Sequence, residues 1–152
     1  MSLDSVRAFF AERAPDIEII ELDVSTATVA EAAAAHGVAP GQIAKTLSLR
    51  AGDRIVLLVT CGDARLDNLK ARAAFGGKIK MLDLSEVEVV TGHPVGGVCP
   101  FGLTTPLPIY CDLSLKAWET VIPAAGAVHS AVRLSPDRMA ALTGAEWVDA
   151  CR

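Results

Sequence analysis

Residues 43–61, with the sequence IAKTLSLRAGDRIVLLVTC, decide the fold of this chain. From Ile43 to Arg50 the residues alternate, so that Lys45 shares one face with Ile43, Leu47 and Leu49. Gly52-Asp53 is typical of a turn, and the run from Ile55 to Cys61 is almost continuously apolar, as expected of a strand buried on both faces. The stretch therefore predicts a β-hairpin inside a covered sheet.

Helices and further strands are expected on both sides of this hairpin. The predicted helices are Ser2 to Ala14, a helix from the Thr28-x-x-Glu31 capping box to Gly37, residues 65–75, a short helix that opens with a second capping box at Ser85-x-x-Glu88 and ends at Gly92, and a last helix that starts at Ser135-Pro136. The predicted strands are Ile17 to Leu22, Ile79 to Leu82, Leu107 to Cys111, Val121 to Ala124 and Ala131 to Leu134.

The order of these elements predicts an α/β fold. The 152 residues fit a single domain over 1–152, and because half of the chain is apolar but only 5% is aromatic, its core must be built mainly from Ala, Val, Leu and Ile. Strands and helices intermix, while the hairpin introduces an antiparallel pair. We therefore expect a curved mixed sheet or a partly closed barrel, surrounded by helices.

The charge of the chain limits its partners. A formal net charge of −4 argues against a protein that grips nucleic acid over a broad basic face, and no helix-turn-helix or other motif for sequence-specific DNA binding is present. A local basic patch does exist, opposed only by Asp67, and it consists of Arg65, Lys70, Arg72, Lys78 and Lys80. This patch is a candidate for phosphate contacts with RNA; the alternative is an ordinary solvated helix face.

The remaining composition predicts a cytoplasmic protein without metal or cofactor. No apolar stretch approaches the roughly 20 residues of a membrane span, and the N-terminus lacks the pattern of a secretory signal. The four cysteines form no C-x-x-C pair or other metal-ligand spacing, which is typical of a reduced compartment.

A glycine- and proline-rich loop, TGHPVGGVCPFG at residues 91–102, is the strongest candidate for a ligand site. Its four glycines let the backbone approach a ligand closely, and prolines such as Pro100 stiffen the loop so that its N–H groups stay aimed. Amides around Gly96 and Gly97, with Val98 and Gly102 nearby, could stabilise the oxyanion of an ester in its tetrahedral state. The alternative is a rigid surface connection.

Three side chains invite chemical interpretation. Lys45 lies at a strand position of apolar parity, where a cation is costly unless it finds a partner or its amine reaches water. His129 follows Ala125-Gly126 and could orient a water, bind the substrate's amino group or only pack. Cys99 could be a thiol nucleophile, but its apolar neighbours predict a raised pKa, and no Ser–His–Asp arrangement stands out.

The loop at 91–102, the segment Ile43-Ala44-Lys45-Thr46-Leu47 and the segment Ala124-Ala125-Gly126-Ala127-Val128-His129 together resemble the YbaK/ProX family. These proteins are free-standing relatives of the editing domain of bacterial prolyl-tRNA synthetase, and they hydrolyse wrongly charged aminoacyl-tRNA. The resemblance implies the same architecture and a pocket in which Lys45 holds the terminal adenosine or the oxyanion, while a ribose hydroxyl helps to activate water. It implies catalytic roles for Lys45, Gly96, Gly97 and His129, and substrate contacts by Thr46, Val98, Pro100, Gly102, Ala125 and Gly126.

The resemblance leads to a specific functional hypothesis. The chain would deacylate, in trans, tRNA(Pro) that carries a small uncharged amino acid such as alanine or 2-aminobutyrate; Cys-tRNA(Pro) is the second candidate. Editing of this kind is needed because a synthetase pocket distinguishes similar side chains by only ~10–200-fold per methylene. The expected partner is the acceptor end of mischarged tRNA, with transient contacts to prolyl-tRNA synthetase or an elongation factor. Two rivals stay open: a non-catalytic nucleic-acid-binding module and a Cys99 hydrolase.

Overall fold

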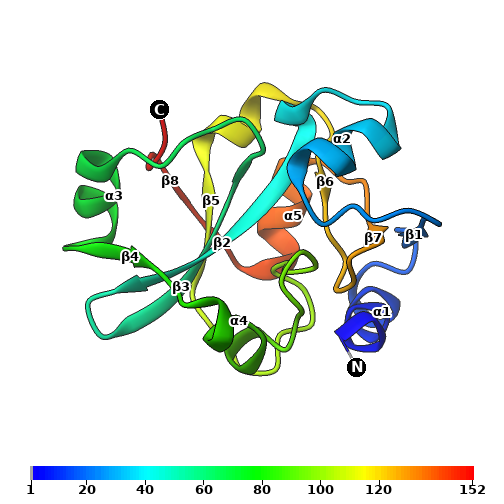
Figure 1. The fold of residues 1–152 in the computed structure, drawn as a ribbon, viewed down its shortest axis with the longest axis horizontal. Helices are drawn as coiled ribbons and strands as arrows, with labels where there is room; N and C mark the ends of the chain where they lie inside the picture. Colours follow the sequence, from blue (N-terminus) through cyan, green and yellow to red (C-terminus); the bar gives the residue numbers. More distant parts are fainter. Residues whose placement is uncertain (1) are drawn as a thin grey trace.

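A six-stranded mixed sheet runs through the middle of the molecule, and helices lie around it (Figure 1). The computed structural model describes residues 2–152. The strands of the sheet follow the order β4-β2-β3-β5-β8, with β6 paired to the beginning of β2. Their bounds are β2 Ile43–Ala51, β3 Arg54–Cys61, β4 Ile79–Met81, β5 Ile109–Asp112, β6 Ile122–Pro123 and β8 Glu146–Val148. A separate antiparallel pair joins β1 (Ile20–Glu21) to β7 (Ser130–Ala131).

The helices are short apart from the first. Their bounds are α1 Ser2–Arg13, α2 Val29–His36, α3 Asn68–Phe75, α4 Leu84–Thr91 and α5 Pro136–Thr143, with 3₁₀ turns η1 at Pro40–Gln42 and η2 at Leu113–Ala117. Within residues 2–152, no helix has the length and apolar character that crossing a membrane requires.

The hairpin of β2 and β3 is the centre of the sheet, as the sequence predicts. The two strands pair antiparallel from Ala44↔Cys61 to Ala51↔Arg54, which sets Lys45 opposite Thr60. β3 then pairs parallel with β5, and β5 pairs parallel with β8, so the sheet is mixed. The α/β prediction is confirmed in its mixed-sheet form. The sheet stays open between β4 and β8 and does not close into a barrel.

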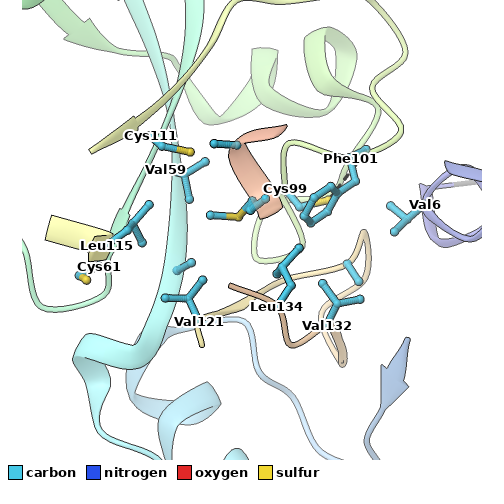
Figure 2. Packing of buried hydrophobic residues seen from close by; sticks show 14 of the residues in the cluster. Val6, Val59, Cys61, Cys99, Phe101, Cys111, Leu115, Val121, Val132 and Leu134 are labelled. Carbon is cyan, nitrogen blue, oxygen red and sulfur yellow. Dashed lines mark hydrogen bonds between the residues drawn. The ribbon is translucent and has the colours of Figure 1, made fainter. Parts of the chain in front are cut away.

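Both faces of β3 are covered, which explains its apolar run. On one face, Val59 and Cys61 join the larger core (Figure 2). In this core, Phe101 packs against Phe10 with ring centroids 4.7 Å apart. On the other face, Val56 and Leu58 pack in a second cluster under α3. Each face therefore takes alternate residues of the strand.

Several predicted element boundaries are confirmed by their caps, and others are wrong. The Thr28 capping box opens α2, and Gly37 ends it in the left-handed conformation with φ +68°. The proposed capping box at Ser85 is wrong, because α4 begins at Leu84 after Asp83 and has no side-chain cap bond. The helix predicted over 65–75 begins only at Asn68, since Leu66 forms a β-bridge with Cys151.

Strand lengths were predicted less well than helix positions. The strands expected at 17–22, 121–124 and 131–134 are reduced to two-residue pairs, and the strand expected at 107–111 starts at Ile109. β8 was not predicted at all, because Glu146-Trp147-Val148 is too short to show a period of its own.

Helix α1 docks on two glycines that lie far away in the sequence. Gly102 and Gly126 both have positive φ, and a Cβ on Gly126 would come within 2.8 Å of the Ser2 carbonyl oxygen. The Ser5 hydroxyl donates a hydrogen bond to the Gly102 carbonyl oxygen over 2.9 Å. The backbone of α1 can approach these segments only where there is no side chain.

Gly126→Ala is expected to lower the free energy of unfolding by about 3 kcal/mol or more, because left-handed strain and overpacking against α1 add together. Gly76→Ala is the matched control: Gly76 has φ +78° but nothing within 4 Å of the added Cβ, so it should cost about 1–2 kcal/mol of strain alone. Urea unfolding followed by circular dichroism measures both. Equal losses in the two variants would contradict the proposed clash.

Candidate active site

A cavity of about 210 Å³ lies between α2, β2, α4 and the segments around residues 95–98 and 122–131. Most of its lining is apolar. Its floor comes from a small buried cluster in which α2 packs on the beginning of β2 and on β6 and β7, and the cluster residues that line the cavity are Ala32, Ile43, Ile122 and Ala131. The polar groups in the lining come from Thr26, Thr28, His36, Lys45, Thr46, Ser48 and Ser130. A few polar groups around an apolar floor are typical of a site for a small ligand.

Lys45 stands at the edge of this cavity and is held by backbone carbonyls. Its Nζ donates to the Gly62 oxygen over 3.2 Å and to the Ala64 oxygen over 2.7 Å. The cation at a position of apolar parity has therefore found a partner in the chain just after β3. An ammonium group has three N–H donors, so one donor remains for a ligand.

The glycine loop contributes Val95, Gly96 and Val98 to the cavity, but not Gly97. The Gly97 amide donates to the Pro94 oxygen over 2.9 Å, and its carbonyl accepts from the Gly126 amide over 3.1 Å. The Gly97 amide, for which the sequence predicts contact with an oxyanion, therefore already donates its hydrogen bond within the loop. The amides of Gly96 and Val98 have no acceptor among residues 2–152, which leaves them available to a ligand.

The same loop is locked onto the segment that follows β6. A Cβ on Gly97 would lie 2.9 Å from the backbone of Ala127, and a Cβ on Gly96 would lie 2.8 Å from the Ala27 Cβ. Gly96 has φ +92°, which other residues rarely adopt. Both glycines are thus required for the close packing of three segments that form the wall of the cavity.

The structure brings together four of the predicted site residues and separates the others from them. Lys45, Thr46, Gly96 and Val98 line the cavity, whereas Gly97, Pro100, Gly102, Ala125, Gly126 and His129 do not. Gly102 and Gly126 support α1 instead. The side chain of His129 is 42% exposed and lies 3.6 Å from Glu21 Oε1.

His36 lines the cavity, although its sequence position indicates only a favourable cation beside the glycine that ends the helix. Its Nε2 is buried without a hydrogen-bond partner among the described residues, as is the Thr46 hydroxyl. Burial, with a smaller contribution from the charge of Arg133, lowers the pKa of His36, so the imidazole is neutral at pH 7. Helical spacing is the sequence signal that places His36 near the cavity, because His36 follows the buried Ala32 by four residues and shares its face of α2.

Cys99 and His93 form a pair that the sequence did not reveal. Cys99 Sγ lies 3.6 Å from His93 Nε2, yet both side chains are fully buried and neither lines the cavity. The ring of His93 is already engaged, with Nε2 2.7 Å from the Phe101 oxygen and Nδ1 bonded to the Ser2 hydroxyl. Burial raises the pKa of Cys99 to about 12 and lowers the pKa of His93, so neither forms the ion pair that activates a thiol.

None of the residues of the predicted basic patch lines the cavity; they belong to α3, to β4 and to the segments before these two elements. Lys70 is committed to Asp149, with 3.2 Å between Nζ and Oδ1, and also donates to the Cys151 oxygen. Arg65, Arg72, Lys78 and Lys80 are exposed. In the part of the chain that the structure describes, no cluster of three or more His, Cys, Asp or Glu side chains could hold a metal ion.

Comparison with known proteins identifies the family of the chain. The model of the aminoacyl-tRNA editing domain family matches residues 23–142, a span that contains every residue of the cavity lining. The chain belongs to this family. A solved structure described as a "putative trans-editing enzyme for prolyl tRNA synthetase" matches this editing domain with a TM-score of 0.91 and 36% identity, covering 99% of the chain and 97% of that structure.

Two relatives are similar in sequence to this editing domain. The "uncharacterized protein YwhH" of Bacillus subtilis is 44% identical over 154 residues, covering 100% of the chain and 98% of the relative. The "putative Cys-tRNA(Pro)/Cys-tRNA(Cys) deacylase EbsC" of Enterococcus faecalis is 30% identical over 116 residues, covering 74% of the chain and 70% of the relative. The YbaK/ProX resemblance is thereby confirmed at the level of the family.

Cys99→Ala is expected to keep most of the deacylase activity of the editing domain. With a pKa of about 12, only about one thiol in ten thousand is ionised at pH 8, and the buried sulfur is out of reach of a substrate. In the native protein Cys99 should also resist iodoacetamide at pH 8, as mass spectrometry can show, while the urea-unfolded protein is alkylated. Trapping of an acyl group on Cys99, with loss of activity in Cys99→Ala, would establish the thiol mechanism instead.

Proposed function

We propose that the chain is a trans-acting aminoacyl-tRNA deacylase, which hydrolyses the ester between a wrong amino acid and the 3′ end of tRNA. The observation that carries this proposal is the small, mostly apolar cavity whose lining includes Lys45, Gly96 and Val98. The aminoacyl side chain occupies the cavity, and the ester carbonyl lies at the edge where Lys45 keeps its remaining donor.

The size and polarity of the cavity support a small uncharged side chain. A water molecule takes about 30 Å³ of liquid, so 210 Å³ corresponds to about seven waters, enough for a small amino acid with its ester. The floor contains no charged side chain that could pair with a charged amino acid. We therefore propose alanine or 2-aminobutyrate on tRNA(Pro) as the substrate, with cysteine on tRNA(Pro) as the alternative that the resemblance to EbsC favours.

The proposed reaction needs positioning and charge stabilisation rather than a protein nucleophile. A water attacks the ester carbonyl, the acyl C–O bond breaks, and the products are the free amino acid and a tRNA with its terminal hydroxyl restored. The oxyanion that forms is stabilised by the Lys45 ammonium and by the amides of Gly96 and Val98. A hydroxyl of the terminal ribose assists the water. His129 has no step in this scheme, because it lies outside the cavity beside Glu21.

The experiment that tests the function is a panel of tRNA(Pro) charged with alanine, 2-aminobutyrate, cysteine or proline. We expect loss of the alanyl or 2-aminobutyryl ester while the prolyl ester survives. Faster loss of the cysteinyl ester would assign the alternative substrate. Survival of all four esters, together with binding of the RNA, would identify a non-catalytic nucleic-acid-binding module.

Lys45→Met is expected to reduce kcat/KM by about 10²–10³-fold, the usual effect of removing one oxyanion donor, while the methionine keeps an apolar stem in place. The variant should also unfold more easily, by up to about 3 kcal/mol, because the Gly62 and Ala64 carbonyls lose a charged donor. Lys116→Met is the matched control, since Lys116 is exposed over the Trp147 ring and does not line the apolar cavity. Kinetics near wild type for Lys45→Met would refute the role of Lys45.

A further inference from the structure

A second, wider and more polar cavity lies on the other side of Lys45. It has a volume of about 690 Å³ and is lined by Lys45, Gly62, Asp63, Ala64, Arg65, Leu66 and Arg152. Lys45 also lines the apolar cavity, so the two spaces adjoin at this residue, and its Nζ bonds to Gly62 and Ala64 of the second lining. We call the second space the arginine groove, because it holds two arginines as well as Lys45.

The two arginines of the groove face each other across a pair of extended backbones. Leu66 and Cys151 form an antiparallel bridge, and next to it the Arg152 amide donates to the Arg65 oxygen over 2.8 Å while the reverse bond measures 3.4 Å. Residues directly opposite each other in such a pair present their side chains on the same face. Arg65 and Arg152 therefore project into one space.

No side chain of residues 2–152 forms an ion pair with either of these two cations. Both residues are exposed, and within residues 2–152 neither side chain makes a hydrogen bond or an ion pair. Like charges directly opposite each other are destabilising. The arrangement therefore costs stability in the free protein, and an anion bound between the guanidinium groups would relieve that cost.

The carboxylates around the groove are mostly engaged elsewhere. Asp67 caps α3 by accepting from the Leu69 and Lys70 amides, and Asp149 pairs with Lys70. Asp112 is buried and accepts from the Ser114 and Ala150 amides. Asp63 is the one carboxylate side chain in the lining, and it lies against Gly41, so the groove keeps an excess of positive charge.

We infer that the arginine groove binds backbone phosphates of the single-stranded 3′ end of tRNA, so that the terminal ester passes Lys45 into the apolar cavity. The inference rests on the proposed function and adds to it the path of the RNA strand. Guanidinium groups match phosphate oxygens in a two-pronged geometry, and phosphate contacts of this kind fix the register of a nucleic acid without reading its sequence. The strand would then enter from the arginine groove and not along the outer faces of α3 and β4.

The test is the affinity of the full chain for an uncharged RNA hairpin with the acceptor stem of tRNA(Pro) and a single-stranded CCA end, measured by fluorescence anisotropy. In Arg65→Gln/Arg152→Gln we expect the Kd to rise about tenfold and the slope of log K against log salt to fall by about 1.4, at roughly 0.7 for each lost phosphate contact to a single strand. A hairpin without the CCA end should bind the variant and the wild type equally. The melting temperature should stay the same or rise, because a repulsive pair is removed.

The control is Arg13→Gln/Arg54→Gln, which removes the same charge from α1 and from the far end of the hairpin, away from the C-terminus (Figure 1). It should leave the Kd and the salt slope unchanged. An unchanged Kd in the groove variant would overturn the inference, as would an equal loss of affinity for the hairpin without CCA or in Arg72→Gln/Lys80→Gln. Because the RNA is uncharged, these outcomes are independent of whether the protein hydrolyses any ester.

Discussion

The site depends on one interaction, the clamp between the Lys45 ammonium and the carbonyls of Gly62 and Ala64. It ties β2 to the chain that leaves β3, at the point where the two strands of the central hairpin separate. A lysine in this position needs acceptors that carry no full charge of their own, because a carboxylate would neutralise the cation. Backbone carbonyls hold the ammonium and leave its positive charge available. Because Lys45 is bonded to backbone carbonyls and not to a carboxylate, its charge adds to that of the cationic groove, which adjoins the apolar cavity at this residue.

The wall of the cavity is held by contacts in which the loop glycines fit against other backbones. The loop around Gly97 and the segment around Ala127 approach so closely that no Cβ fits between them. Cys99 and His93 are fully buried, and burial raises the pKa of the thiol and lowers the pKa of the imidazole, which favours the uncharged form of both groups. Residues of the same glycine loop therefore serve two purposes, with Gly96 and Val98 facing the cavity and Cys99 and Phe101 filling the interior.

Much of this arrangement can be predicted from the sequence, because local patterns reflect local interactions. The alternation before Gly52-Asp53 and the apolar run after it predict the hairpin, and the Thr28 capping box predicts the start of α2. The features that the sequence does not predict depend on contacts between distant segments. β8 is too short to show a period and is defined by its pairing with β5, and the close packing of Gly97 against Ala127 has no signature in the sequence of the loop.

The same limit explains which site residues were missed. His36 looks like an ordinary residue at the end of a helix until α2 is packed on β2, which brings it into the cavity lining. The pairing of Arg65 with Arg152 joins residues near the middle and the end of the chain and has no signature in either segment. Gly102 and Gly126, for which the family-like motifs predict substrate contacts, lie outside the cavity lining, and their lack of side chains allows α1 to dock.

Alanine in the lining of the apolar cavity has a consequence for how this domain tells substrates apart. Ala32, Ala44, Ala124 and Ala131 have no rotamers, so the boundary that they form is fixed by the backbone and cannot move aside for a larger guest. Selection by such a wall requires no ordering of side chains when the ligand enters. Equally, one added methyl group at any of these positions reshapes the cavity directly. A fold with this wall can change the amino acid that it accepts through single substitutions, without rebuilding the scaffold around Lys45.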